Sequence, residues 1–120
     1  MNILIIEDDK LTLNAVQHSL ENLGHTTAVA KSGEEAIDMI NKTTYDLIIC
    51  DVMMPGISGL SFVTVLRSVH MCFTPIIMMS TLNHGPLLDA SFTAGANDFI
   101  NKPFTQEELA DKLKKFETQV

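Results

Sequence analysis

The sequence has few basic residues. Its 120 residues include 8 Lys and Arg against 15 Asp and Glu, which gives a formal net charge of −7. A protein that binds nucleic acid or an anionic membrane surface on its own needs clustered Lys and Arg. We therefore expect this chain to bind neither nucleic acid nor a membrane directly.

Features of several other protein classes are also absent. The 2 cysteines, Cys50 and Cys72, lack the spacing of a metal site, and the position of Cys50 at the end of an apolar run favours a buried, reduced thiol. No apolar run approaches the roughly 18 residues of a membrane span, and the N-terminus lacks the pattern of a secretory signal. There are no repeats and no Pro/Gly/Ser-rich linkers. Together these absences predict one cytoplasmic domain over residues 1–120.

What the sequence does contain is an alternation of short apolar runs with segments of helical periodicity. The runs ILII, LIIC and IIMM are continuously apolar, which is typical of strands covered by helices on both faces. Strands are expected at residues 2–6, 26–30, 46–50, 75–79 and 98–100.

Helices are expected after each of these strands. Ser32 with Glu35, and Thr105 with Glu108, have the spacing of a capping box, in which two side chains satisfy backbone N–H groups at a helix start. Gly24 is well suited to follow the end of the first helix. The expected helices cover residues 11–23, 33–40, 59–69 and 86–93, with a last helix that begins after Thr105.

Five such strand–helix units predict an α/β fold with a doubly wound, five-stranded parallel sheet and helices on both faces. Because parallel crossovers are right-handed, five strands suit the flavodoxin-like order 2-1-3-4-5. Ligands of such sheets bind beyond the carboxyl ends of the strands. The residues that follow each strand are therefore the candidates for function.

Reactive side chains follow four of the expected strands. Glu7 and Asp8 follow the first, Asp51 the third, Ser80 the fourth and Lys102 the fifth. Carboxylate oxygens around a small cavity select Mg²⁺, and a carboxylate can attack phosphorus to form an acyl phosphate. A lysine and a hydroxyl can stabilise the charge on transferring phosphoryl oxygens. These residue types indicate phosphoryl transfer at one edge of the sheet.

The motifs ILIIEDD, LIICDVMMPGISGL, PIIMMS and AGANDFINKPF follow one another over essentially the whole chain. In this order and spacing they resemble the receiver domain of response regulators in two-component phosphorelay signalling. The resemblance implies a domain that accepts a phosphoryl group from a phosphohistidine of a sensor histidine kinase or histidine phosphotransfer protein, with Mg²⁺ or Mn²⁺ as cofactor. It further implies that phosphorylation switches the surface that contacts an output domain or target protein, and it leaves room for a phosphorylation-dependent dimer.

The resemblance also assigns residue roles by position. Asp51 would be the phosphoacceptor, and Lys102 would contact the phosphoryl group. The metal would be held by Glu7, Asp8, Asp51 and the backbone carbonyl of Met53.

Further positions would belong to a conformational switch. Ser80 would supply the switch hydroxyl and Phe99 lies at the aromatic switch position, although a turn hydroxyl and a core side chain are the plainer explanations of these two residues. The resemblance also predicts a cis peptide bond between Lys102 and Pro103. Asp9 would lead into the first helix without touching the metal.

Three other functions compete with this interpretation. An aspartate-nucleophile enzyme of the haloacid-dehalogenase type needs an Asp where this chain has Met53, so we expect no turnover of outside substrates. A flavodoxin-like cofactor carrier needs a phosphate cradle where the carboxylates of Glu7, Asp8 and Asp9 would repel phosphate. A degenerate receiver would lack reactive groups that are all present here. A stand-alone regulator and the N-terminal part of a longer one are equally open.

The chain departs from the family pattern at three places. Ser80 replaces the commoner threonine, and Thr81 stands where the family usually has Ala or Gly. The segment that begins at Gly85-Pro86 is poor in charge. We expect a short or mobile fourth helix there, with apolar residues that can form a partner or dimer surface.

Overall fold

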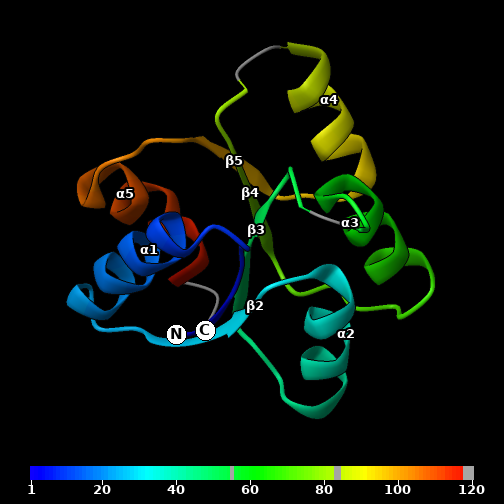
Figure 1. Ribbon diagram of the computed structural model, residues 1–120, viewed down its shortest axis with the longest axis horizontal. Coiled ribbons are helices and arrows are strands. Elements are labelled where there is room, and N and C mark those ends of the chain that lie inside the picture. Colours follow the sequence, from blue (N-terminus) through cyan, green and yellow to red (C-terminus); the bar gives the residue numbers. More distant parts are fainter. Residues whose placement is uncertain (55, 83–84, 118–120) are drawn as a thin grey trace.

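Strands with apolar middles form a parallel sheet at the centre of the computed structural model, which describes residues 1–54, 56–82 and 85–117 (Figure 1). The five strands have the order β2-β1-β3-β4-β5, and the described pairings are parallel. The predicted fold class and strand order are therefore confirmed. The strands are β1 (Asn2–Ile6), β2 (Thr26–Ala30), β3 (Leu47–Asp51), β4 (Ile76–Ser80) and β5 (Asp98–Asn101).

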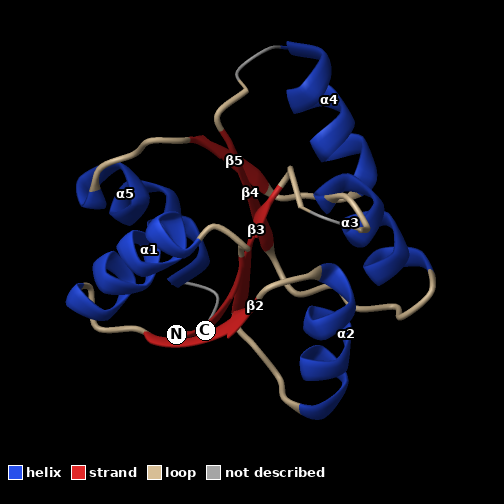
Figure 2. Ribbon diagram, in the orientation of Figure 1, coloured by secondary structure: helices blue, strands red, loops and turns tan. Residues whose placement is uncertain are grey.

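Helices cover both faces of the sheet (Figure 2). On one face lie α1 (Lys10–Asn22) and α5 (Gln106–Glu117). On the other face lie α2 (Gly33–Lys42), α3 (Gly59–Ser68) and α4 (Gly85–Ala94). Within the described ranges, none of these helices has the length and apolar character needed to cross a bilayer.

The sheet separates two apolar cores, because alternate residues of a strand point to opposite faces. Ile3 and Ile5 of β1 pack in the core beneath α1 and α5, whereas Leu4 and Ile6 pack in the core on the other side. All four side chains are fully buried. Each such burial stabilises the fold by about 1.5–3 kcal/mol, which is why the strands are apolar without alternation.

The predicted capping box at Thr105 forms in both directions, whereas at Ser32 the structure shows the serine half of the predicted box. The hydroxyl of Ser32 accepts the backbone N–H of Glu35 at 3.1 Å at the start of α2. At the start of α5 the hydroxyl of Thr105 accepts the N–H of Glu108 at 3.1 Å, while the Glu108 carboxylate accepts the N–H of Thr105 at 3.3 Å. These bonds fix where both helices begin.

Three strands, β3, β4 and β5, end one residue later than predicted, and in two of them the added residue belongs to the candidate site. Asp51 and Ser80 are the last residues of β3 and β4, because Asp51 pairs in register with Met79 and Ser80 pairs with Asn101. The prediction had placed both polar residues just after the apolar runs. Ladder pairing with the neighbouring strand, which the polarity of a single side chain does not reveal, extends the sheet to include them.

The fourth helix is longer at both ends than the sequence predicts. It has 10 residues, and Pro86 stands in its first turn, where proline needs no hydrogen-bond partner for its nitrogen. The preceding Asn83 and His84 lie outside the described residues, as does Pro55.

Arg67 ties the end of α3 to two loops. Its guanidinium donates to the backbone carbonyl of Gly95 from Nε at 3.1 Å and from Nη2 at 2.9 Å, and to the side-chain oxygen of Asn97 at 3.0 Å. Nη1 donates to the carbonyls of Cys72 at 2.9 Å and Thr74 at 2.7 Å. Partial burial lowers the pKa of this guanidinium from its ordinary value. The side chain therefore joins the α3–β4 loop to the α4–β5 loop.

Asp98 joins β5 to α5 through two lysines. Its carboxylate lies 3.2 Å from the Lys112 ammonium and 2.7 Å from that of Lys115, and it accepts the backbone N–H of Phe99 at 2.8 Å. Burial alone would raise the pKa of Asp98, but the hydrogen bonds from Lys115, Phe99 and Lys112 outweigh burial and lower it.

Asp98→Asn should therefore destabilise the domain in a pH-dependent way. At pH 7 we expect a loss of about 1 kcal/mol of unfolding free energy, because both lysines are partly exposed and an exposed pair contributes little. A carboxylate with a lowered folded-state pKa stabilises above its unfolded-state pKa, and this stabilisation is lost as pH falls through the folded-state value. Urea unfolding should show the difference between wild type and variant at pH 7 and its progressive loss as the pH falls below 3.8, the ordinary pKa of an aspartate. A difference that persists unchanged at the lower pH would contradict the assignment.

Candidate functional site

Three carboxylates meet at the carboxyl edge of the sheet. β1 and β3 are neighbours, with Ile6 opposite Cys50. Glu7, which follows Ile6, and Asp51, which follows Cys50, therefore lie at the same level. Glu7, Asp8 and Asp51 can each place a carboxylate oxygen within 4.8 Å of the others. Glu7 is fully buried and Asp51 is nearly so, whereas Asp8 is exposed. The sequence prediction that these residues converge is confirmed.

Lys102 completes this cluster from the end of β5. Its ammonium lies 2.8 Å from Oε1 of Glu7 and 3.4 Å from Oδ2 of Asp51. Burial alone would lower the pKa of Lys102, but the hydrogen bond to Glu7 and the charge of Asp51 outweigh burial and raise it. The lysine is therefore a fixed cation beside the Asp51 carboxylate. The peptide bond from Lys102 to Pro103 is cis, as the family resemblance predicts.

Glu7 uses both of its oxygens within the protein. Oε1 accepts from Lys102, and Oε2 accepts the backbone N–H groups of Asp8 at 3.1 Å and Asp9 at 3.3 Å. Burial raises the pKa of Glu7, and Lys102 opposes this effect without cancelling it. Glu7 thus positions the lysine and shapes the loop after β1, in addition to lying within reach of a shared cation.

Asp9 leads into α1, as predicted. It caps α1 by accepting the backbone N–H of Thr12 at 2.9 Å and the Thr12 hydroxyl at 2.6 Å. These bonds lower the pKa of Asp9. The run of three acidic residues therefore divides into two that face the site and one that begins a helix.

Of the two predicted switch residues, Ser80 lies at the carboxyl edge of the sheet and Phe99 lies further inside it, opposite Met78. Ser80 is fully buried at the end of β4, and its Oγ accepts the backbone N–H of Leu82 at 2.9 Å. Phe99 is buried in the core shared with α3 and α4. Met53 donates its backbone N–H to Oδ1 of Asp51 at 3.2 Å, and its side chain is 62% exposed. The switch roles and the metal contact of the Met53 carbonyl stay predictions.

Gly59 has a role at this site that the sequence did not reveal. A Cβ atom at this position would collide with the backbone carbonyl of Asp51 and lie 2.8 Å from Cα of Val52. The backbone N–H of Gly59 donates to the carbonyl of Val52 at 2.9 Å. A glycine therefore lets α3 begin directly against the strand end that carries Asp51. Gly59 directly follows Ser58, whose hydroxyl caps α3 by accepting the backbone N–H of Ser61 at 3.2 Å.

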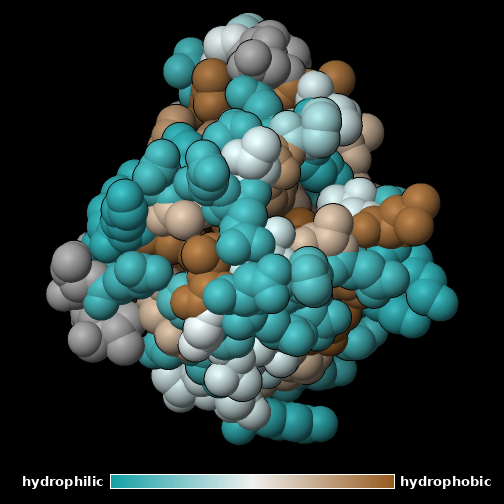
Figure 3. Space-filling view, turned by 90° about the vertical axis from the view of Figure 1, so that its left-hand side faces the viewer, coloured by the Kyte–Doolittle hydropathy of each residue, from teal (hydrophilic) through white to brown (hydrophobic). Residues whose placement is uncertain are grey.

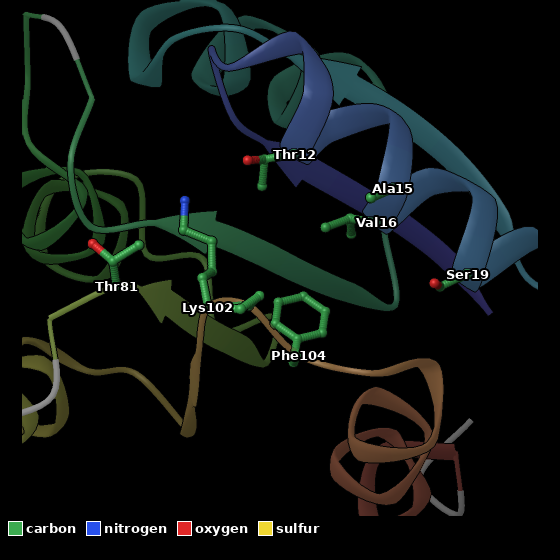
Figure 4. A pocket seen from close by; sticks show the side chains of 8 residues that line it. Thr12, Ala15, Val16, Ser19, Thr81, Lys102 and Phe104 are labelled. Carbon is green, nitrogen blue, oxygen red and sulfur yellow. The ribbon is translucent and has the colours of Figure 1, made fainter.

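A groove of about 280 Å³ opens beside Lys102, on the side of α1 (Figure 4). Helix α1 supplies one wall, and Thr81, Lys102 and the ring of Phe104 supply the other (Figure 4). The surrounding α1–α5 face is mostly hydrophilic and shows only small apolar areas (Figure 3). The α1 residues of this wall share one face of the helix: Thr12, Ala15, Val16 and Ser19.

The arrangement fits a small, hard cation and a phosphoryl group. Clustered carboxylate oxygens are the ligands that Mg²⁺ and Mn²⁺ prefer. A buried cluster of two carboxylates and one lysine still carries excess negative charge, which a cation would compensate. A carboxylate beside a lysine and a cation can serve as a nucleophile toward phosphorus, since the positive charges stabilise the transferring oxygens.

Comparison with known sequences identifies similar proteins. Residues 3–114 match the sequence profile of the response regulator receiver domain. The chain is 31% identical over 114 residues to the transcriptional regulatory protein CrdR of Helicobacter pylori, covering 95% of this chain and 54% of that protein. It is 34% identical over 114 residues to the response regulator MprA of Mycobacterium avium, covering 95% of this chain and 50% of that protein. The chain thus spans about half the length of these curated relatives.

Solved structures show the same likeness. A putative response regulator from Chloroflexus aurantiacus superposes with a TM-score of 0.90 at 34% identity, covering 96% of this chain and 95% of that one. The chemotaxis response regulator CheY4 of Vibrio cholerae superposes with a TM-score of 0.88 at 31% identity, covering 96% and 97%. Fold and sequence therefore agree over almost the whole chain.

Proposed function

The chain belongs to the response regulator receiver domain family of two-component signalling, and from this premise we propose that Asp51 is its phosphoacceptor. The observation that carries the proposal is the position of Lys102, whose ammonium lies 3.4 Å from the Asp51 carboxylate at the carboxyl edge of the sheet. The phosphodonor would be the phosphohistidine of a sensor histidine kinase or a histidine phosphotransfer protein.

The chemistry follows from the residues at this edge. An oxygen of Asp51 attacks the phosphorus, the P–N bond of the phosphohistidine breaks, and its electron pair returns to the imidazole. Lys102 stabilises the phosphoryl oxygens during the transfer. Water later attacks the acyl phosphate, which releases phosphate and restores the Asp51 carboxylate. The domain would act once per phosphorylation and would turn over no outside substrate.

A divalent cation belongs to the proposal as cofactor. Asp8, Asp51 and the backbone carbonyl of Met53 would hold Mg²⁺ or Mn²⁺, and Glu7 would contribute charge nearby. When bound, the cation neutralises negative charge on the phosphoryl group and on the carboxylates that surround it.

Phosphorylation would be read through Ser80 and Phe99. We propose that the Ser80 hydroxyl, which holds the N–H of Leu82 in this structure, turns to donate to a phosphoryl oxygen. Phe99 would then repack, and the surface of α4, β5 and α5 would shift toward its active form, because only the phosphorylated state gains these contacts. An output domain or target protein, or a second phosphorylated copy, would recognise that surface.

The donor would approach along the groove beside Lys102. This groove adjoins α1 and is lined by Lys102, whose ammonium lies 3.4 Å from the Asp51 carboxylate. Docking there would bring a phosphohistidine to Asp51 from the open edge of the sheet. We place this exchange in the cytoplasm, where sensor kinases present their phosphohistidine.

Intact mass spectrometry tests the proposal. The chain is incubated with phosphoramidate or acetyl phosphate and Mg²⁺, and separately with a phosphorylated histidine phosphotransfer protein. We expect the mass of a single phosphoryl group, which hydroxylamine removes because it is an acyl phosphate, and no uptake after chelation of the metal. Absence of uptake from every donor would overturn the proposal. Continuous release of product from an unrelated phosphate ester would favour an enzyme instead.

Thr81→Ala should speed both phosphorylation and dephosphorylation. Thr81 is exposed next to the buried Ser80 and lines the groove beside Lys102, so its β-branched side chain narrows access to Asp51. We expect several-fold faster uptake from phosphoramidate and several-fold faster hydrolysis, both followed by intact mass. Thr81→Ser is the matched control, because it keeps the hydroxyl and removes only the methyl group. Its rates of uptake and hydrolysis should lie between those of wild type and Thr81→Ala. Unchanged rates in Thr81→Ala would show that this side chain does not limit access.

A further inference from the structure

The β3–α3 loop lies against the first turn of α2. A Cβ atom at Gly33 would lie 2.5 Å from Cγ2 of Ile57, in the loop, and 3.3 Å from Cδ1 of Phe62, on α3. A Cβ atom at Gly56 would lie 3.6 Å from Oε1 of Glu34, the second residue of α2. Helices α2 and α3 lie side by side on one face of the sheet (Figure 1). The start of α2 therefore supports the loop that follows the phosphoacceptor strand.

Local preference does not explain a glycine at position 33. Its φ angle lies outside the left-handed region, so an L-residue could adopt the same backbone conformation. Gly33 is the first residue of α2, and alanine is a better helix former than glycine. The cap of the helix is made by the Ser32 hydroxyl rather than by Gly33. What the missing side chain provides is the space beside Ile57.

Ile57 has little freedom to make room for a side chain at position 33. Carbon atoms in contact lie about 3.5–4.0 Å apart, so a methyl group there would displace Cγ2 of Ile57 by about 1 Å. This atom branches directly from Cβ, and χ1 of a β-branched residue is stiff. Ile57 also packs against the apolar core that contains the fully buried Phe62. A displacement of its side chain is therefore passed to the backbone of the loop.

The loop connects this contact to the phosphoacceptor site. It joins β3 directly to α3, and it is closed at its base by the Gly59 N–H, which donates to the Val52 carbonyl at 2.9 Å. Within it the backbone N–H of Met53 donates to Oδ1 of Asp51 at 3.2 Å. The Met53 carbonyl is also a proposed metal ligand. A shift of Ile57 would thus move a segment that contacts Asp51 and offers an oxygen to the cation.

We propose that Gly33 is a positioning residue for the phosphoacceptor site. By leaving room for Ile57 at the start of α2, it holds the β3–α3 loop where the Met53 carbonyl can complete the cation site beside Asp51. Gly33 offers no side chain to the carboxylate cluster, so its effect passes through the loop. The inference rests on the proposed function, because it concerns the cation of the same site.

Binding of Mn²⁺ to Gly33→Ala tests the proposal. Free Mn²⁺ is followed by electron paramagnetic resonance as it is titrated into the protein. We expect the dissociation constant to rise about tenfold over wild type, as is usual when a residue that orients a metal ligand is changed. Phosphoryl uptake from phosphoramidate should be slower at limiting Mg²⁺ and should approach the wild-type rate at saturating Mg²⁺. A general loss of folded protein would not show this dependence on metal concentration.

Three further variants separate positioning from stability, and the thermal midpoint of each is recorded. Ile57→Ala in the Gly33→Ala background removes the colliding methyl group, so it should bring the dissociation constant back toward the wild-type value. Ile57→Ala alone should weaken binding less than Gly33→Ala does. Ala36→Gly is the matched control, because Ala36 is buried one turn further along α2. This substitution lowers stability but adds no atom against the loop, so it should leave the dissociation constant unchanged.

Three results would overturn the proposal. They are a wild-type dissociation constant in Gly33→Ala, no recovery in the double variant, and equal weakening by Ala36→Gly. The amide NMR signal of Met53 separates these results from a failure of the proposed function. If wild type bound no Mn²⁺ and took up no phosphoryl group, the proposed function would fail. A Met53 signal that moves in Gly33→Ala and returns in the double variant would still support the positioning role, and an unmoved signal would contradict it.

Discussion

Asp51→Asn is expected to abolish phosphoryl uptake completely while the fold is kept. The amide keeps the size of the side chain and an oxygen that can accept the Met53 N–H, which Asp51 accepts at 3.2 Å. The amide lacks the anionic oxygen that attacks phosphorus. The substitution also removes the negative charge that pairs with the Lys102 ammonium. Intact mass after incubation with phosphoramidate and Mg²⁺ should therefore show no added phosphoryl group, whereas wild type gains one.

Neighbouring acidic residues provide the controls for this loss. Asp8→Ala should also abolish the metal-dependent reaction, and Glu7→Ala should weaken it, because Glu7 positions Lys102 at 2.8 Å. Asp9→Ala should retain uptake and reduce stability, since Asp9 caps α1. Uptake by Asp51→Asn at the wild-type level would mean that another residue is the acceptor. Loss of metal binding in Asp9→Ala as complete as in Asp8→Ala would show that the assignment of the acidic residues is wrong by one position.

Arg67→Ala is expected to produce a large loss of stability. The substitution removes hydrogen bonds to three backbone carbonyls and to Asn97, and each bond from a charged donor contributes about 1.5–3 kcal/mol. Because water can reach some of the freed acceptors, we expect a net loss of about 3 kcal/mol of unfolding free energy. That loss corresponds to a decrease of about 10 °C in the thermal midpoint of a domain of this size.

Two further variants separate the causes of this loss. Arg67→Lys keeps the positive charge but loses the planar fork that reaches both loops, so it should recover less than half of the stability. Ser68→Ala is the neighbouring control and should be close to neutral, because Ser68 is exposed and its hydroxyl donates to the Thr64 carbonyl within its own helix. Full recovery in Arg67→Lys would show that charge, rather than hydrogen-bond geometry, holds the loops together.

The sequence predicted the sheet order and the residues at its carboxyl edge because both follow from local patterns. Continuous apolar runs indicate doubly covered strands, and the capping residues Ser32 and Thr105 mark helix starts through contacts three residues away. The convergence of Glu7, Asp8 and Asp51 then follows from the topology of parallel strands, since every such strand presents its end at the same edge.

The remaining features depend on contacts between residues far apart in the sequence. The four acceptor residues of Arg67 come from two loops, and nothing local in the sequence marks them. The requirement for glycine at position 59 arises from the backbone of Asp51, which only the folded chain brings close. The left-handed conformation of Met71 was missed because methionine is an unusual residue for it. In each case tertiary packing overrides the local preference.

Strand β5 has its two ends fixed to different parts of the molecule. Asp98 at its start is bound to lysines on α5, and Lys102, one residue past its end, is bound to Glu7 and Asp51. An extended backbone hardly changes length. Strand β5 therefore forms a rigid connection between the carboxylate cluster and α5. Any displacement of Lys102 along the strand must either pull α5 with it or break the ion pairs of Asp98. The ion-pair part of the link between β5 and α5 rests on two partly exposed lysines, so it should weaken with rising ionic strength, whereas the apolar packing of α5 should not.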